Sequence, residues 1–295
     1  MAAARGPARS DYGIHVRAGP DTATGAAALA PRAAGLKMYL DQTYGPLRLE
    51  GLDSIAAHLE TWPHDRPVVC HAEERSAAAV ILLAGLIGRP VHICHVARRS
   101  EVELIRRAKD RGYPVTCEVT PHHLYLTADD AAAMPPGRGE VRPVLGSADD
   151  RNALWAALRD GTIDCIATDH APHTREEKDG ADPPPGFPGL ETSLALMLGA
   201  VHEGRLESGR IEVLMHTNPR RIFGLPVQED TWIEVDPDAT WEARTIHSRC
   251  GWTPFAGHLL RGVVRRVVLR GREAFRDGVV TAPAGSGNDI TKEQQ

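Results

Sequence analysis

Residues 163–178, "IDCIATDHAPHTREEK", decide how this chain should fold. The stretch begins as a short apolar run and turns abruptly polar at Asp169, His170 and His173. Such a run is typical of a buried strand. Imidazole and carboxylate groups at its end suit a metal site or a proton-transfer site, and either one requires partner residues from elsewhere in the sequence.

Four more runs of this kind lie upstream, namely "GLKMYL" (35–40), "RPVVCHAE" (66–73), "PVHICHVA" (90–97) and "YPVTCEVTPHH" (113–123). Helical patterns separate most of them. Ser147, Asp150 and Gly161 frame one helix, and Ser100 with Glu103 is the capping signature of another. Strands that alternate with helices of this length predict βαβ units around a parallel sheet.

Composition excludes several classes of protein. A net charge of −5 and the lack of a long basic cluster give no reason to expect a nucleic-acid partner. No apolar run approaches the ~18 residues of a membrane span, so no membrane association is expected. The five cysteines have no paired spacing, which favours reduced thiols and a cytoplasmic location.

Polar residues occur at a consistent place in the predicted strands. Lys37, His71, His95, Glu118 and Asp169 all lie at or near the C-terminal end of an apolar run. In a (β/α)8 barrel these ends form the active face, where residues from different strands converge. Two histidines and an aspartate from separate strands would be suitable zinc ligands.

Each residue taken alone has a purely structural explanation. A single buried histidine such as His71 is more often a hydrogen-bonded core residue than a ligand. The pairs His92/His95 and His170/His173 have helix-like spacing but lie in or just after strands, so they are not a helical zinc motif. The coincidence of ionisable groups at the same end of several strands favours a shared metal site.

Longer motifs carry a resemblance to a known family. They are "GLKMYL", "VVCHAEE", "HICHVA", "CEVTPHHL", "GEVRPVLGS", "ATDHAPHTREEK", "PPPGFPGLET", "NPRRIFGLP" and "VRRVVLRG". Together they resemble the dihydroorotase domains of animal trifunctional pyrimidine-synthesis proteins (carbamoyl-phosphate synthetase/aspartate transcarbamylase/dihydroorotase), members of the amidohydrolase superfamily. The match runs from about residue 35 to 282. Dihydropyrimidinases and allantoinases share the Lys/His/His/Asp skeleton but are not expected to share "GEVRPVLGS" or "PPPGFPGLET" in this form.

The resemblance implies an α/β fold, an incomplete (β/α)8 TIM-like barrel of the metal-dependent amidohydrolase type with a remnant of a small C-terminal β-subdomain. Residues 35–225 would supply strands four to eight of the barrel with their helices, and residues 226–282 the β-subdomain segment. Residues 1–34 are expected to be divergent and partly disordered, with a remnant of the third strand in "DYGIHV", and residues 283–295 to form a disordered tail.

The resemblance also assigns metal-binding roles. Lys37 corresponds to a lysine that is carboxylated by CO₂ and bridges two zinc ions. His71 and His95 correspond to ligands of the second zinc, and Asp169 to a ligand that is also the catalytic general acid/base.

Further family positions fall on the substrate-binding side of the site. Arg142 and His173 match groups that hold the substrate's carboxylate, with the backbone near Pro185 contributing. Thr43 and Tyr44 lie where the family has a mobile lid, although phenylalanine is more usual at the position of Tyr44.

One family motif is missing. The family has a His-x-His pair on its first strand, but no two of the fourteen histidines here are two residues apart. His15 lies only 22 residues before Lys37 (37 − 15), whereas one βα unit needs roughly 30 residues. We therefore expect strands one and two to be lacking, together with two zinc ligands and two substrate-binding residues. The complete family holds two zinc ions, and animal members a third near the positions of Cys94 and Glu118; fewer or more weakly bound ions are expected here.

The leading functional hypothesis is a dihydroorotase-like zinc amidohydrolase, which interconverts N-carbamoyl-L-aspartate and L-dihydroorotate in de novo pyrimidine biosynthesis. Its partners would be this small-molecule substrate and either a second copy of the chain or other pyrimidine-synthesis domains. One alternative is a non-catalytic protein that uses the fold for binding or assembly. Another is a hydrolase of a different cyclic amide, such as a hydantoin or dihydropyrimidine. Arg142 discriminates between these activities and that of a dihydroorotase, because a substrate that lacks a carboxylate would not need this guanidinium.

Overall fold

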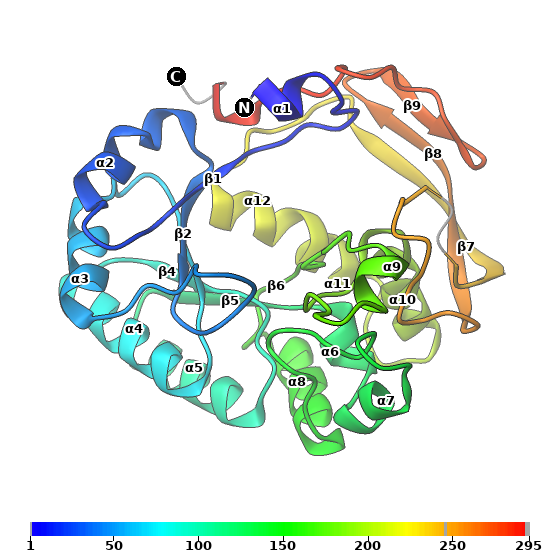
Figure 1. The fold of residues 1–295 in the computed structure, drawn as a ribbon. Coiled ribbons are helices and arrows are strands. Elements are labelled where there is room, and N and C mark those ends of the chain that lie inside the picture. The colour runs from blue at the N-terminus through cyan, green and yellow to red at the C-terminus, as the bar shows by residue number, and fades with distance from the viewer. Residues whose placement is uncertain (1, 245–246, 293–295) are drawn as a thin grey trace.

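The central feature of the computed structural model, which describes residues 2–244 and 247–292, is an arc of six parallel strands. The strands lie side by side in sequence order (Figure 1). They are β1 (His15–Arg17), β2 (Gly35–Tyr39), β3 (Val68–His71), β4 (Val91–Ile93), β5 (Val115–Val119) and β6 (Cys165–Ile166). The predicted parallel sheet of a partial α/β barrel is confirmed.

Helices cover the outer face of the arc. They are α2 (Ala23–Ala28), α3 (Leu52–Thr61), α4 (Glu74–Ile87), α5 (Arg99–Asp110) and α8 (Ala148–Asp160). Strand residues that pack into the apolar core include Leu36, Cys70 and Ile93. Because successive side chains of a strand point to opposite faces, the neighbouring residues Lys37 and His92 are directed into the barrel.

The N-termini of α8 and α5 can be compared with the helix caps predicted at Ser147 and Ser100. Ser147 and Asp150 form the predicted capping box of α8, and Gly161 ends the helix with a left-handed φ of 84°. The prediction for Ser100 was wrong, since α5 already begins at Arg99. The capping carboxylate belongs instead to Glu101, a buried side chain that accepts hydrogen bonds from the backbone N–H groups of residues 74, 97 and 98. A carboxylate that satisfies three buried donors, two of them at the start of this helix, outweighs the local Ser-x-x-Glu pattern.

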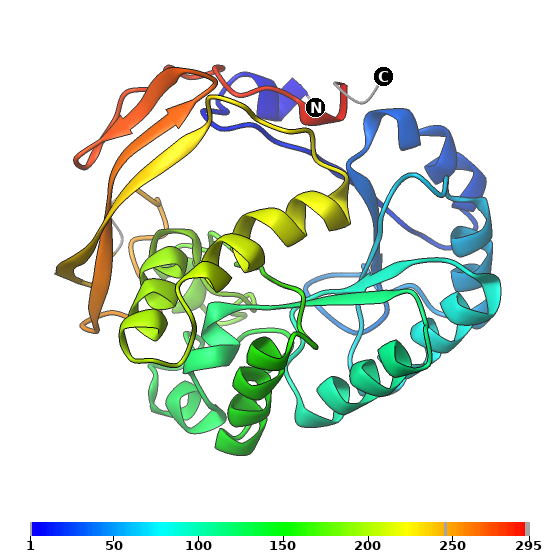
Figure 2. The same cartoon turned by 180° about the vertical axis from the view of Figure 1, so that it is seen from behind.

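A helical segment lies at the open side of the arc. It comprises α11 (Gly209–Glu212), a π-helix (Val213–Thr217) and α12 (Asn218–Phe223). Figures 1 and 2 both show α12 between β1 and β6. Phe223 at its end stacks on His15, with ring centroids 6.2 Å apart, and meets His92 edge-on at 5.3 Å. Asn218 donates to the backbone carbonyl of Asp164 beside β6. The segment thus packs against both ends of the arc.

A small antiparallel sheet follows. It consists of β7 (Trp232–Glu242), β8 (Leu259–Leu269), β9 (Arg272–Arg276) and β10 (Val279–Val280), in the order β10-β9-β8-β7. Helix α10 (Leu190–His202) packs against β8. The two chain ends lie close together (Figure 1), where Tyr12 pairs with Asp289 and Asp11 contacts Arg270. The division of the chain into domains stays a prediction.

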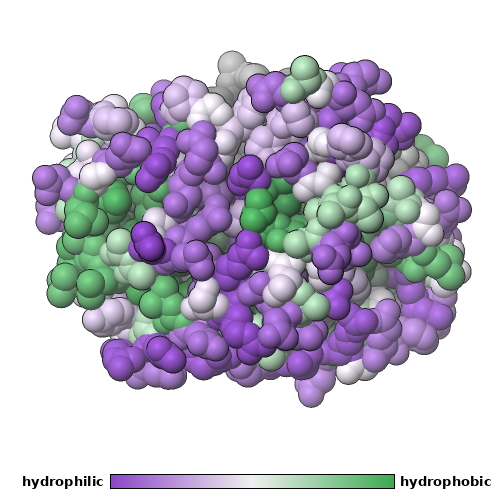
Figure 3. Space-filling model, turned by 60° about the horizontal axis from the view of Figure 1, so that its bottom comes forward, coloured by the Kyte–Doolittle hydropathy of each residue, from purple (hydrophilic) through white to green (hydrophobic). Residues whose placement is uncertain are grey.

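The remaining elements are short. They are α1 (Ala2–Arg5), α6 (Pro121–Tyr125), α7 (Ala128–Ala133), α9 (Arg175–Lys178) and 3-10 turns at Ala30–Arg32 and Ile290–Lys292. Figure 3 shows a mostly hydrophilic face with apolar side chains gathered at its left. The exposed large apolar residues of the chain include Leu82 and Leu86 of α4. Within the described ranges, no helix has both the length and the apolar character needed to cross a bilayer.

Gly262 offers a test of how α10 and β8 pack. Its φ is 95°, and an added Cβ would lie 2.4 Å from Leu198 Cδ1. We expect Gly262→Ala to lower the free energy of unfolding by the ~1–2 kcal/mol cost of a left-handed alanine, plus ~1–3 kcal/mol for overpacking. Gly278→Ala is the matched control, because its φ is 87° and its surroundings are open. Equal losses in urea denaturation would contradict this close approach of helix and strand.

Candidate active site

The C-terminal ends of the barrel strands carry two residues with unusual backbone geometry. His95 follows β4 with a φ of 35°, and Asp169 follows β6 with a φ of 44°. Positive φ is sparsely populated by residues other than glycine, and such strain clusters at functional sites. Both side chains therefore occupy these positions at a conformational cost.

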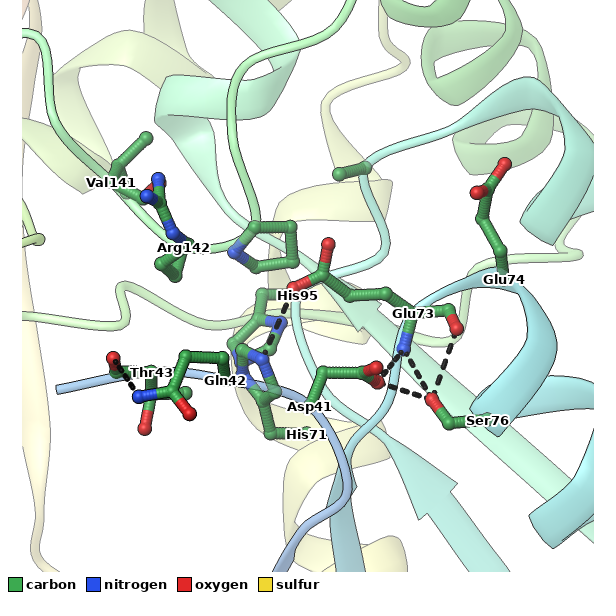
Figure 4. A network of polar contacts seen from close by, with 12 residues as sticks. Asp41, Gln42, Thr43, His71, Glu73, Glu74, Ser76, His95, Val141 and Arg142 are labelled. Atoms are coloured by element: carbon green, nitrogen blue, oxygen red, sulfur yellow. Dashed lines mark hydrogen bonds and ion pairs between the residues drawn. The ribbon is translucent and has the colours of Figure 1, made fainter. Parts of the chain in front are cut away.

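His71 and His95 face each other at this end of the barrel. Nδ1 of His71 lies 3.0 Å from Nε2 of His95, and both rings are buried (Figure 4). Nε2 of His71 lies 3.3 Å from a carboxylate oxygen of Glu73. Nδ1 of His95 has no hydrogen-bond partner among the described residues. Burial lowers the pKa of His95 well below its usual value, so its ring is neutral.

These two imidazoles fit a metal ion. Their facing nitrogens come from different strands and converge on one point, as ligands of a shared ion do. A carboxylate beside the outer nitrogen of a ligating histidine, as Glu73 is to His71, orients the ring toward the ion. The predicted ligands His71 and His95 are thus brought together.

Lys37 and Cys94 lie next to each other inside the barrel. Nζ of Lys37 donates to Sγ of Cys94 at 3.0 Å. Burial raises the pKa of the Cys94 thiol to about 12, so the sulfur is protonated at neutral pH. An amine of this kind must lose a proton and gain CO₂ before it can offer carboxylate oxygens to a metal.

Glu118 pairs with a histidine that the strand-end pattern had not selected. Its Oε2 lies 3.0 Å from Nε2 of His92. Burial opposes its ionisation, but hydrogen bonds from His92 and Cys94 and the charge of Lys37 together hold the pKa of Glu118 below its usual value. Glu118 is therefore a carboxylate in the barrel interior.

Asp169 is accessible to solvent but is enclosed by protein on most sides. This enclosure raises the pKa of its carboxyl group to about 7, despite the opposing charge of Lys37. A carboxyl group that titrates near neutrality is suited to accept and return a proton.

Arg142 and His173 lie on loops beyond the strand ends. Arg142 donates to the carbonyl of Val141 at 3.0 Å, and about a third of its side chain is exposed. Figure 4 shows Arg142, Gln42 and Thr43 around the His71–His95 pair. The guanidinium therefore has donors left for a ligand.

The predicted lid meets the opposite loop. The ring of Tyr44 lies 6.2 Å from the ring of His173, and Tyr44 is largely exposed. The Thr43 hydroxyl is buried and has no hydrogen-bond partner among the described residues. A buried hydroxyl without a partner is costly, which makes it a candidate to bind a ligand.

Lys178 is a residue that the sequence analysis missed. It is fully buried, and its Nζ donates to the carbonyls of Glu140 and Pro184 at 2.8 Å each. Burial lowers its pKa to about 8. These carbonyls are two residues from Arg142 and one residue from Pro185, and Gly186 N also donates to the Glu140 carbonyl. Lys178 thus joins the two loops expected to hold substrate.

Cys165, which faces into the barrel beside Glu118, was also missed. Its immediate neighbours, Asp164 and Ile166, do not identify it as a ligand, and only the register of β5 and β6 places it opposite Glu118. Strand alternation was the available signal, since Cys165 and Asp169 lie on the same run.

Comparison with known proteins places this geometry in a family. No family model matches the chain. The chain is 49% identical over 292 residues to the multifunctional protein pyr1-3 of Dictyostelium discoideum and 48% identical over 285 residues to the multifunctional protein CAD of Squalus acanthias. These matches cover 98% and 96% of the chain but only 13% of each relative. A dihydroorotase of Mycobacterium tuberculosis is 40% identical over 254 residues, which is 81% of the chain and 57% of that protein.

Solved structures agree. The inactive dihydroorotase-like domain of a Chaetomium thermophilum CAD-like multifunctional protein superposes with a TM-score of 0.80 at 28% identity, covering 95% of the chain and 78% of that domain. The L-hydantoinase of Arthrobacter aurescens superposes with a TM-score of 0.91 at 23% identity, covering 97% and 75%, which supports the fold alone.

The fold and its strand-end residues define an amidohydrolase-type barrel protein. Within that class the chain is similar to dihydroorotases and to CAD-type multifunctional proteins over most of its length. Dihydroorotases and hydantoinases are metal-dependent amidohydrolases, which agrees with the donor set at the strand ends.

Lys178→Met should lower the stability of the protein by ~1–3 kcal/mol. Methionine fills the space, but it leaves the buried Pro184 carbonyl without this donor and the Glu140 carbonyl with only the N–H of Gly186. Urea denaturation of the full chain measures the loss. Glu176→Met, which places the same residue at an exposed position of α9, should have little effect. A Lys178→Met variant as stable as the Glu176→Met control would show that the clamp contributes nothing.

Proposed function

We propose that this chain is a dihydroorotase-type cyclic amidohydrolase that interconverts L-dihydroorotate and N-carbamoyl-L-aspartate. The observation that carries the proposal is the convergence of His71 Nδ1 and His95 Nε2 at 3.0 Å. Asp169 just beyond the end of β6 and the remaining donors of Arg142 add to it. The relatives named above support the substrate class. The chain spans 13% of each multifunctional relative and 57% of the Mycobacterium tuberculosis dihydroorotase.

Zinc is the ion we propose, held by His71, His95, Asp169 and, once carboxylated, Lys37. Imidazole and carboxylate are ligands that zinc prefers, and the two buried rings face each other with their nitrogens 3.0 Å apart. Bound zinc would supply a hydroxide nucleophile near neutral pH and polarise the ring carbonyl. The family resemblance alone would make Cys94 and Glu118 partners of a further ion.

The chain's own groups would move the protons. Hydrolysis adds water to the ring carbonyl carbon, breaks the C–N bond, and leaves a proton on the departing nitrogen. Asp169 would take that proton from the attacking water and return it to nitrogen, which requires a carboxylate whose pKa lies near the working pH. Its enclosure at the strand end, which raises its pKa to about 7, supports this role.

Arg142, His173 and the backbone near Pro185 would hold the substrate's carboxylate. A guanidinium binds both oxygens of a planar carboxylate through its fork of donors. Burial lowers the pKa of His173, so a neutral ring would donate one hydrogen bond instead of supplying a charge. Thr43 and Tyr44 would close over the bound substrate, with the Thr43 hydroxyl gaining the partner it lacks.

We also propose that the chain acts alongside other pyrimidine-synthesis domains, either on one polypeptide or by association, or pairs with a second copy of itself. Its multifunctional relatives support the first arrangement. The five cysteines are free and buried, which favours a reducing compartment and hence the cytoplasm.

Asp169→Asn should reduce turnover of dihydroorotate by ~10²–10⁴-fold, because asparagine cannot shuttle a proton. Substrate binding measured by calorimetry should persist. Asp110→Asn, at an exposed position of α5, is the control and should keep full activity. If Asp169→Asn retains most of its kcat, Asp169 is not the proton carrier. If the unaltered zinc-loaded chain shows no turnover at all, the catalytic proposal fails.

Arg142→Lys should raise the KM for dihydroorotate by ~10–100-fold while changing kcat little, since lysine keeps the charge but loses the bidentate fork. Turnover of a dihydropyrimidine without a carboxylate is the matched comparison and should be unaffected. A chain that prefers this neutral substrate, with no response to the substitution, would favour hydantoin or dihydropyrimidine hydrolysis instead.

A further inference from the structure

A second cluster of potential metal ligands lies inside the strands, away from the strand ends. His92 on β4, Glu118 on β5 and Cys165 on β6 are all buried, and their ligand atoms lie within 4.8 Å of one another. His92 lies within β4, whereas His95 lies two residues beyond the end of that strand. The cluster is therefore set apart from the facing His71 and His95 rings.

The ligand set separates this cluster from the site implied by family resemblance, in which Glu118 would share an ion with Cys94. Cys94 contacts both Lys37 and Glu118. The ligand atoms that lie within 4.8 Å of one another belong to His92, Glu118 and Cys165, and Oε2 of Glu118 lies 3.0 Å from Nε2 of His92. Cys165 is the register partner of Glu118 on the neighbouring strand. The cysteine that completes the trio is Cys165.

The His92 ring is already oriented for a ligand. Its Nδ1 lies 2.8 Å from the hydroxyl of Thr116, its register partner on β5. This contact occupies one ring nitrogen and directs the other, Nε2, toward Glu118. A partner on the second ring nitrogen is what holds a ligating histidine in its tautomer and rotamer.

The chemistry of the trio matches a borderline-soft divalent cation. An imidazole, a carboxylate and a thiolate are three of the ligand types of zinc, whereas magnesium and calcium need mostly oxygen ligands. A thiolate and a carboxylate together cancel the charge of a divalent ion, so the loaded site is neutral where charge is costly. Binding would release the thiol proton of Cys165 and the proton between His92 and Glu118.

The cluster is reachable from two sides. A cavity of about 390 Å³ near the start of the strands is lined by residues that include His92 and Thr116. A second cavity of about 370 Å³ within the barrel is lined by residues that include Glu118 and Lys37. The first offers an entry path, and the second offers room for a water molecule as a fourth ligand.

We propose that His92, Glu118 and Cys165 form a binding site for a zinc-class divalent cation that links β4, β5 and β6. The site is independent of the proposed catalysis, because none of its ligands is among the residues to which we assign proton transfer or substrate binding. A bound ion here joins three adjacent strands and raises the stability of the arc.

Cobalt(II) tests this, because cobalt bound to a thiolate gives an intense charge-transfer band in the near ultraviolet, whereas histidine and carboxylate ligands do not. The full chain, freed of metal, is titrated with cobalt chloride. We expect the band in the unaltered protein and in Cys94→Ser and Cys117→Ser, and its loss in Cys165→Ser. Cys117 is the matched control, since it is buried on β5 but belongs to the apolar core outside the barrel interior.

Thr116→Val provides a second test that spares the fold. Valine keeps the shape of threonine and every proposed ligand, but it removes the hydroxyl that holds His92. We expect cobalt affinity, read from the same band, to fall ~10–100-fold. No band in the unaltered chain, a band lost in Cys94→Ser instead of Cys165→Ser, or unchanged affinity in Thr116→Val would each overturn the proposal. Dihydroorotate turnover is measured in parallel, so that failure of the catalytic proposal is recognised separately.

Discussion

The parallel register of β2 to β6 determines where every barrel-derived candidate residue lies. Lys37 pairs with Val69, Val69 with His92, and His92 with Thr116, so these residues form one level across four strands. Alternation then sends this level inward and the residues beside it into the apolar core against the helices. A slip of one residue in any strand would exchange the two faces. The apolar outer face therefore fixes the position of the chemical groups on the inner face.

Burying polar groups inside the barrel costs free energy. Charged and polar groups lose their hydration inside the barrel and must be compensated by partners. Lys37 has Cys94, and Glu118 has His92. At this end of the barrel, the buried groups without a hydrogen-bond partner among the residues described include Nδ1 of His95, Nε2 of His71 and the Thr43 hydroxyl. Groups that the fold leaves uncompensated are those that a ligand can satisfy, which ties the energetic cost of the interior to its function.

Local patterns predicted the part of this arrangement that depends on the strands. Each apolar run ended in a polar residue, so the strand ends and the convergence of His71 with His95 followed from sequence spacing and the rules of parallel barrels. The predicted helix cap at Ser100 was wrong because the Glu101 carboxylate accepts hydrogen bonds from backbone N–H groups at the starts of two helices. This is a tertiary contact that the local sequence does not show. Lys178 was missed because "REEK" is typical of an exposed turn of helix, and only the packed loops show that its amine is buried. Cys165 needed the register of two strands that are far apart in sequence.

The two levels of the barrel also differ in what holds them. His92, Glu118 and Cys165 lie within regular strands, so their spacing is set by backbone hydrogen bonds that are among the most persistent in a sheet protein. His95 and Asp169 lie just beyond strands at strained positive φ, and the buried amine of Lys178 is one of the contacts that join the neighbouring loops. Local opening is expected to begin in loops with few apolar contacts and not in the strands. The loops around His95 and Asp169 can therefore rearrange around a substrate while His92, Glu118 and Cys165 keep their geometry. The loop contacts that would move do not hold these three strand residues in place.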